Sequence, residues 1–178
     1  MKMLRQKRGV VWVSTILYIL ISLAVLSLVL VSVQPIIDKN RDKALCSQSE
    51  QMLRDIDSRI RDVGSVEGNK LSLDAKISRG NLIINSSSNS ITWELTDSAY
   101  QYSEENTPIN ISANIKAITR RSRENKWDVK IYLDYQGKYN VTYNNGETSR
   151  VLSESDYVLF FEYAGNSDSL KQIDVRVS

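Results

Sequence analysis

The amino-acid sequence predicts an α+β protein, with one long N-terminal helix followed by an antiparallel β-sandwich-like domain. Two observations predict this fold class. Residues 10–33 contain no charged side chain, and a helical spacing of apolar residues continues beyond them. From residue 65 onward apolar and polar residues alternate instead, which is typical of half-buried strands. We therefore divide the chain into a basic leader (1–9), a transmembrane helix (10–34), an amphipathic helix continuation (35–64) and an extracellular β-sandwich domain (65–178).

The apolar run is long enough to cross a membrane. As an α-helix with a rise of about 1.5 Å per residue, residues 10–33 would extend about 36 Å, against about 30 Å for a hydrocarbon core. The leader that precedes this run is basic and contains no acidic residue, whereas the flank after it carries both signs. The positive-inside rule then predicts a cytoplasmic N-terminus and an extracellular C-terminal domain.

An amphipathic stripe follows the apolar run. One helical face gathers Leu45, Cys46, Ser49, Met52, Leu53, Ile56, Ile60 and Val63. The stripe predicts that the helix packs on the domain that follows, which we favour over a free-standing coiled coil. Charged neighbours such as Asp57 are expected to lie mostly off this face. Gly64 is expected to end the helix, and Pro35 to kink or break it. Cys46 is interpreted as a packing residue, because the chain has no second thiol and no histidine.

The remaining residues predict eight short strands. Apolar rows fall within residues 71–77, 82–84, 91–95, 109–115, 127–133, 139–143, 157–163 and 173–177. Turn-forming residues separate the rows, and Asn145-Gly146 is the strongest hairpin signal among them. Length and spacing suit an antiparallel sandwich. We expect residues 65–178 to fold without the membrane helix.

The composition argues against an enzyme. Without histidine and with a single cysteine, the chain cannot build a histidine-based catalytic or zinc site, and no phosphate-binding loop motif occurs. No cofactor or metal is therefore expected. Glu104 and Glu105 are neighbours, so in an extended segment they would face opposite ways. A basic cluster is interpreted as a solvated hairpin turn, not a nucleic-acid site, because acidic residues outnumber basic ones in residues 65–178; it contains Arg120, Arg121, Arg123 and Lys126.

Three N-x-[ST] motifs begin at Asn85, Asn110 and Asn140 and are candidate glycosylation sites. Strand alternation would place Ile111 and Val141 inward. It would thereby turn outward their neighbours Asn110, Ser112, Asn140 and Thr142. Asn85 opens a turn. All three asparagines are expected to be accessible, and the protein is expected to be a glycoprotein if its host modifies such sites.

The chain also resembles a known family, by motif in residues 7–33 and by architecture in the rest. A leader that ends in Lys7-Arg8-Gly9, an apolar helix that starts at Val10, an amphipathic continuation and a β-rich domain together resemble archaeal type IV pilin-like proteins, which include archaellins. The resemblance implies that a prepilin peptidase cuts between Gly9 and Val10. It also implies that the helix then packs against copies of itself or other pilin-like subunits in a surface filament. Ser14 stands where bacterial type IV pilins have Glu, which disfavours a bacterial-type pilin.

Two other classes of protein remain open. An N-in, C-out membrane-anchored extracellular β domain for adhesion or binding, not polymerised, would share the basic flank and the apolar span. A cell-surface enzyme that uses only carboxylates is the third class. A cleft with paired carboxylates would favour that enzyme over the two structural interpretations.

Overall fold

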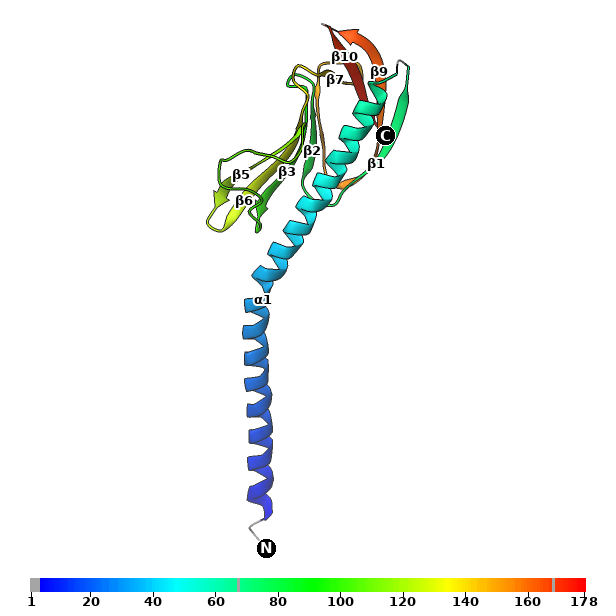
Figure 1. Cartoon of the computed structure of the whole chain (residues 1–178). Coiled ribbons are helices and arrows are strands. Elements are labelled where there is room, and N and C mark those ends of the chain that lie inside the picture. The colour runs from blue at the N-terminus through cyan, green and yellow to red at the C-terminus, as the bar shows by residue number, and fades with distance from the viewer. Residues whose placement is uncertain (1–3, 67, 168) are drawn as a thin grey trace. The chain divides into compact units, whose positions relative to one another are not determined.

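The structure is a computed structural model that describes residues 4–66, 68–167 and 169–178, with side chains from Trp12 onward. The helix α1 (Leu4–Val63) comes first, and the strands follow in an unbroken series (Figure 1). The strands are β1 (Lys70–Ile77), β2 (Asn81–Asn85), β3 (Ser90–Ser98), β4 (Ile109–Asn110), β5 (Ile115–Arg123), β6 (Lys126–Asp134), β7 (Tyr139–Tyr143), β8 (Ser149–Leu152), β9 (Ser155–Ser167) and β10 (Leu170–Val177). The expected α+β class with a long N-terminal helix is confirmed.

The helix passes through Pro35 without interruption, so the break considered at this residue does not occur. It ends at Val63, as predicted, and the Gly64 amide donates a final helical hydrogen bond of 2.9 Å to the Ile60 carbonyl. A glycine is needed here for space, because a Cβ on Gly64 would lie 2.9 Å from Tyr139 Cε1. Close packing between the helix end and the start of β7 therefore selects this residue.

The chain forms two compact units that divide within α1, between Lys39 and Asn40. The first unit contains the N-terminal part of the helix. The second unit, Asn40–Ser178, contains the rest of the helix and every described strand.

The strands of the second unit form two sheets. One has four strands in the order β1-β9-β10-β7, and the other has six in the order β4-β5-β6-β3-β2-β8. Neighbouring strands pair antiparallel except β7 and β10, which run parallel with Val141 opposite Ile173. The expected antiparallel sandwich therefore contains one parallel pair, at the edge of the smaller sheet.

Both sheets and the C-terminal part of α1 contribute to one core. Leu53, Ile56 and Ile60 of the helix are fully buried with large side chains from the strands, among them Trp93 and Phe161. Figure 1 shows this cyan part of α1 lying beside the strands. The predicted stripe is confirmed: six of its members are buried, and Leu45 and Met52 are half-buried. The helix thus supplies part of the domain's interior.

The predicted strand at residues 109–115 is in fact two strands with a turn between them. The amides of Ile111 and Ser112 both donate to the Ile115 carbonyl, at 2.9 and 3.1 Å, and this turn separates the two-residue β4 from β5. The apolar alternation there was wrongly interpreted as one strand. Strand β5 also extends to Arg123 and β6 begins at Lys126, so all four residues of the basic cluster lie in strands. The turn that joins β5 to β6 is confined to Glu124 and Asn125.

Candidate functional site

The first unit presents a continuous apolar surface. We call residues 12–37 of α1 the apolar segment; its large apolar side chains are 40–74% exposed, with Trp12 at 73% and Val31 at 74%. In the described part of the chain, α1 is the one helix long and apolar enough to cross a membrane, and none of its most apolar window is buried. A helix in the core of a soluble domain would instead be mostly buried. Exposed apolar surface of this extent marks an interaction with lipid or with other proteins.

Serine hydroxyls in the apolar segment form hydrogen bonds within the helix. Ser22 Oγ donates to the Tyr18 carbonyl at 2.8 Å, Ser27 Oγ to Leu23 at 2.8 Å and Ser32 Oγ to Leu28 at 2.9 Å. These bonds offset the cost of placing hydroxyl groups in an apolar medium. The segment is thus chemically suited to lipid or to the faces of other apolar helices.

The predicted processing site lies at the start of the same helix. Lys7, Arg8, Gly9 and Val10 fall within α1, but their side chains lie outside the described residues. Cleavage between Gly9 and Val10 therefore stays a prediction.

In the second unit, carboxylates of α1 fasten the helix to the β domain. The first is Asp42, which is 2% exposed. Its Oδ1 accepts a hydrogen bond of 2.6 Å from Arg79 Nη1, and its Oδ2 accepts one of 2.6 Å from the Ala99 amide. Asp42 thereby joins the helix to the β1–β2 turn and to the segment that follows β3.

The second fastening carboxylate is Glu50. It accepts a hydrogen bond of 2.7 Å from the Tyr102 hydroxyl and forms an ion pair of 2.6 Å with Arg54. Burial raises the pKa of Glu50, but the hydrogen bonds from Tyr102 and Arg54 and the charge of Arg54 lower it by more, so it lies below its ordinary value. Burial, followed by the contact with Glu50, raises the pKa of Tyr102.

The third fastening carboxylate is Asp57, which is 7% exposed. Its Oδ1 accepts hydrogen bonds from Asn114 Nδ2 at 2.8 Å and from the Tyr135 hydroxyl at 2.9 Å, while its Oδ2 lies 3.2 Å from Arg61 Nε. Burial, and then the charge of Asp57, raise the pKa of Tyr135. The expectation that Asp57 lies off the packed face was wrong, because polar partners on the β domain compensate its burial.

Sequence reasoning missed these carboxylates as a group. A usable signal was the spacing of Asp42, which precedes Cys46 by four residues and Ser49 by seven and so continues the stripe toward the N-terminus. The partners Asn114 and Tyr135 carry no comparable signal, because they are far from α1 in the sequence.

The three sequon asparagines have different surroundings. Asn110 is exposed, whereas Asn85 and Asn140 are half-buried, and Asn85 Oδ1 accepts a hydrogen bond from the Ser88 amide in its turn. Ser112 is also half-buried. Thr142 was expected to be exposed on the outer face of its strand, and this expectation was wrong. Its side chain is 3% exposed and donates to Asp174 Oδ1 at 3.0 Å, because the turn that follows β7 closes over this pair.

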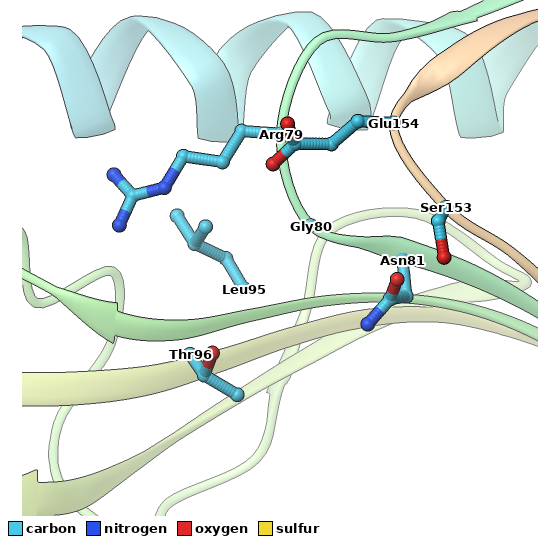
Figure 2. Close-up of a pocket in the computed structure, with 7 residues that line it drawn as sticks. All are labelled: Arg79, Gly80, Asn81, Leu95, Thr96, Ser153 and Glu154. Carbon is cyan, nitrogen blue, oxygen red and sulfur yellow. The ribbon is translucent and has the colours of Figure 1, made fainter.

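A cavity of about 390 Å³ lies at one end of β2 and β3 (Figure 2). Its lining consists of Arg79, Gly80, Asn81, Leu95, Thr96, Ser153 and Glu154. Glu154 supplies the one carboxylate of this lining, so the cavity has no carboxylate pair. Trp93 Nε1 donates to the Arg79 carbonyl at 3.1 Å, and Gly80 has a φ of +87°, so the turn is held against the sheet.

Two members of the basic cluster are engaged within the domain. Arg121 lies 3.3 Å from Glu105 Oε2 and 5.0 Å above the ring of Trp127, and Arg123 pairs with Asp97. In the described part of the chain, no group of three or more acidic or cysteine side chains is arranged to hold a metal ion.

In comparisons with family models, curated proteins and solved structures, nothing matches this chain. The class of protein is therefore defined by its architecture alone. It is a protein with an exposed apolar helix segment that continues into the core of a two-sheet β domain.

Proposed function

We propose that this protein is a structural, pilin-like subunit of an archaeal type IV pilus-like surface filament, assembled through its apolar segment. One observation carries the proposal. A single helix has its apolar side chains exposed along residues 12–37 and buried in the β domain along residues 46–63. The C-terminal part of the helix thus packs in the core of its own β domain, while the side chains of the apolar segment are exposed.

The apolar segment requires apolar surroundings. In the membrane, lipid would cover it; in a filament, the same segments of neighbouring copies would cover it. Lys2, Arg5, Lys7 and Arg8 favour the cytoplasmic side of the membrane, with the β domain outside. Removal of residues 1–9 by a prepilin peptidase would release the helix from that interface and allow it to pack into a filament.

The competing function is a membrane-anchored extracellular β domain for adhesion or binding. In that case lipid alone would cover the apolar segment, and the basic leader would stay attached. The two functions therefore differ in the mature N-terminus and in what lies next to the apolar segment.

The first experiment determines the N-terminus of the native, surface-displayed protein by mass spectrometry. We expect a chain that begins at Val10. Gly9→Leu should leave the leader attached and abolish filaments, whereas Gln6→Leu, which adds bulk elsewhere in the leader, should be processed normally. Recovery of residues 1–9 on the surface-displayed protein would favour the plain anchor.

The second experiment tests whether apolar segments of different copies are neighbours. Cysteines are introduced one at a time at Leu23, Leu26 and Leu30 and treated on cells with a short bifunctional thiol reagent. We expect a cross-linked dimer from at least one position, and none from the matched control Ser87→Cys on the β2–β3 turn. Cys46 does not interfere, because it is fully buried and its pKa is raised to about 12. Monomers from all three positions would contradict assembly through this segment.

A further inference from the structure

Three side chains from distant parts of the chain form a continuous row at the helix–sheet interface. Lys138 Nζ donates a hydrogen bond of 2.5 Å to Asn114 Oδ1, and Asn114 Nδ2 donates one of 2.8 Å to Asp57 Oδ1. Lys138 belongs to the β6–β7 turn, Asn114 to the β4–β5 connection and Asp57 to α1. These two partners fix the orientation of the Asn114 amide, because the Lys138 donor contacts its oxygen and the Asp57 acceptor contacts its nitrogen.

The row brings together the groups required for an amide exchange. A lysine amine is a nucleophile once it is neutral, and the carboxamide carbon of asparagine is an electrophile. A carboxylate beside the amide nitrogen can move a proton between the two nitrogens. Asn114 is 8% exposed and Asp57 is 7% exposed, so bulk water is largely kept from the amide carbon.

The backbone holds these side chains in place. The Asn114 carbonyl accepts a hydrogen bond of 3.0 Å from the Asp134 amide, and the Lys138 amide donates one of 2.9 Å to the Tyr135 carbonyl. Both reacting residues are thus anchored to the same short stretch at the end of β6. The Tyr135 hydroxyl and Arg61 orient the Asp57 carboxylate from its two oxygens. Fixed placement of reacting groups lowers the entropic part of a reaction barrier.

We propose that Lys138 and Asn114 become joined by an intramolecular isopeptide bond, with Asp57 as the proton carrier. Lys138 Nζ gives one proton to water and attacks Cγ of Asn114. The Nζ–Cγ bond forms and the Cγ–Nδ2 bond breaks, while Asp57 moves a second proton from Nζ to Nδ2. The Asn114 nitrogen leaves as ammonia, and no oxidant, metal or cofactor takes part.

The proposed bond depends on the docked helix and not on filament assembly. Because α1 supplies Asp57, the bond would form only after the helix has packed on the β domain. It would then link the start of β5 to the β6–β7 turn covalently. A protein that is only a membrane anchor would form the isopeptide bond equally well. Absence of the bond and absence of filament assembly are therefore separate, distinguishable outcomes.

The test is mass spectrometry of the full chain purified in detergent, intact and after trypsin digestion. We expect the wild-type protein to be lighter than its sequence by one ammonia molecule. Digestion should give a branched peptide that contains both Asn114 and Lys138. Lys138→Arg, which keeps the charge at a surface position, should have its full sequence mass. The matched control Lys116→Arg, which alters the lysine paired with Asp134 at 2.7 Å, should still lose ammonia.

A second variant tests the proton carrier. Asp57→Asn preserves the shape of the side chain and should have its full sequence mass, with circular dichroism to verify its fold. A full-mass wild-type protein that trypsin cleaves after Lys138 would overturn the isopeptide bond. Loss of ammonia that persists in Lys138→Arg would assign it to another site, and persistence in a folded Asp57→Asn would remove Asp57 from the reaction.

Discussion

Asp42 and Arg79 form an ion pair of 2.6 Å at the point where α1 enters the β domain. The carboxylate is almost fully buried, while the guanidinium keeps a side-chain exposure of 32%. Asp42 also accepts a hydrogen bond from the Ala99 amide. One carboxylate thus joins two separate segments, the β1–β2 turn and the residues that follow β3, to the helix.

Asp42→Asn should therefore destabilise the domain. The change leaves Arg79 without its charged partner, and we expect a loss of about 2 kcal/mol in the free energy of unfolding. The measurement is chemical denaturation of the full chain in detergent, followed by tryptophan fluorescence, to which the buried Trp93 contributes. Asp55→Asn, at an exposed position of the same helix, should change stability by less than about 0.5 kcal/mol. Equal effects of the two substitutions would contradict the assigned role of Asp42.

Gly64→Ala should be destabilising because of steric overlap. The new methyl group would lie 2.9 Å from Tyr139 Cε1 and 3.2 Å from the Ile60 carbonyl oxygen, and we expect a cost of about 1–3 kcal/mol. Gly137→Ala is the comparison, since Gly137 has a φ of +73° and open space around it, so backbone strain alone should cost about 1 kcal/mol. Thermal denaturation would rank the two. A harmless Gly64→Ala would show that the helix end tolerates a shift.

Cys46 should resist thiol reagents in the folded protein. Burial, with a smaller contribution from the charge of Asp42, raises its pKa to about 12, so the reactive thiolate is scarce as well as inaccessible. At pH 8 we expect no reaction with a chromogenic disulfide until denaturant is added. A cysteine introduced at the exposed Ser87 should react at once in the same assay. Rapid labelling of native Cys46 would show that the C-terminal part of α1 opens readily from the sheets.

Alkaline pH should weaken the packing of α1 on the β domain and lower the stability of the protein. The pKa of Tyr135 in the folded protein lies above its ordinary value of 10.0, so the associated stability is present below about pH 10 and declines as the pH rises further. Tyr135→Phe should lower stability by about 1 kcal/mol at neutral pH, because the hydrogen bond to Asp57 is lost. It should also reduce the decline in stability above pH 10. Denaturation midpoints measured at increasing pH provide the test, and an unchanged alkaline decline in the variant would contradict it.

The β domain should need the C-terminal part of α1. Leu53, Ile56 and Ile60 are fully buried, and burial of each such side chain contributes about 1.5–3 kcal/mol. The expectation that residues 65–178 fold alone is therefore revised. We expect a chain of residues 40–178 to give sharp, dispersed NMR signals, and one of residues 65–178 to aggregate or unfold. A well-folded 65–178 fragment would show that the sheets can repack without the helix.

Long, regular patterns in the sequence predicted much of the fold. The stripe on α1 was predictable because its apolar positions repeat at helical spacing, and the longer strands because their alternation spans several residues. Strand β8 was missed because Leu152 is its only buried residue. Residues 120–123 were taken for part of a turn because they form a charged cluster between two apolar rows. They are extended because they form backbone pairs with β6. Backbone pairing does not depend on apolar side chains, so a hydrophobic pattern cannot predict it.

The candidate sites were predictable only where the signal was local. The apolar segment follows directly from an uncharged run of residues. The contacts of Asp57 with Asn114 and of Asn114 with Lys138 join residues that only the fold brings together. Thr142 shows the same limitation, because alternation predicted its side of the strand but not the turn that covers it.

The central position of β10 in the four-stranded sheet determines when the domain can close during synthesis. Strands β9 and β7 both pair with β10, and β1 pairs only with β9, so this sheet is completed last. The six-stranded sheet needs nothing beyond Leu152 and can form earlier. Until residues 170–177 emerge, the apolar stripe of α1 lacks part of its cover and is open to chaperones and proteases. A chain whose synthesis stops short of β10 would stay in that state. Completion of the four-stranded sheet therefore distinguishes full-length molecules, whose stripe is covered, from truncated ones, whose stripe stays exposed.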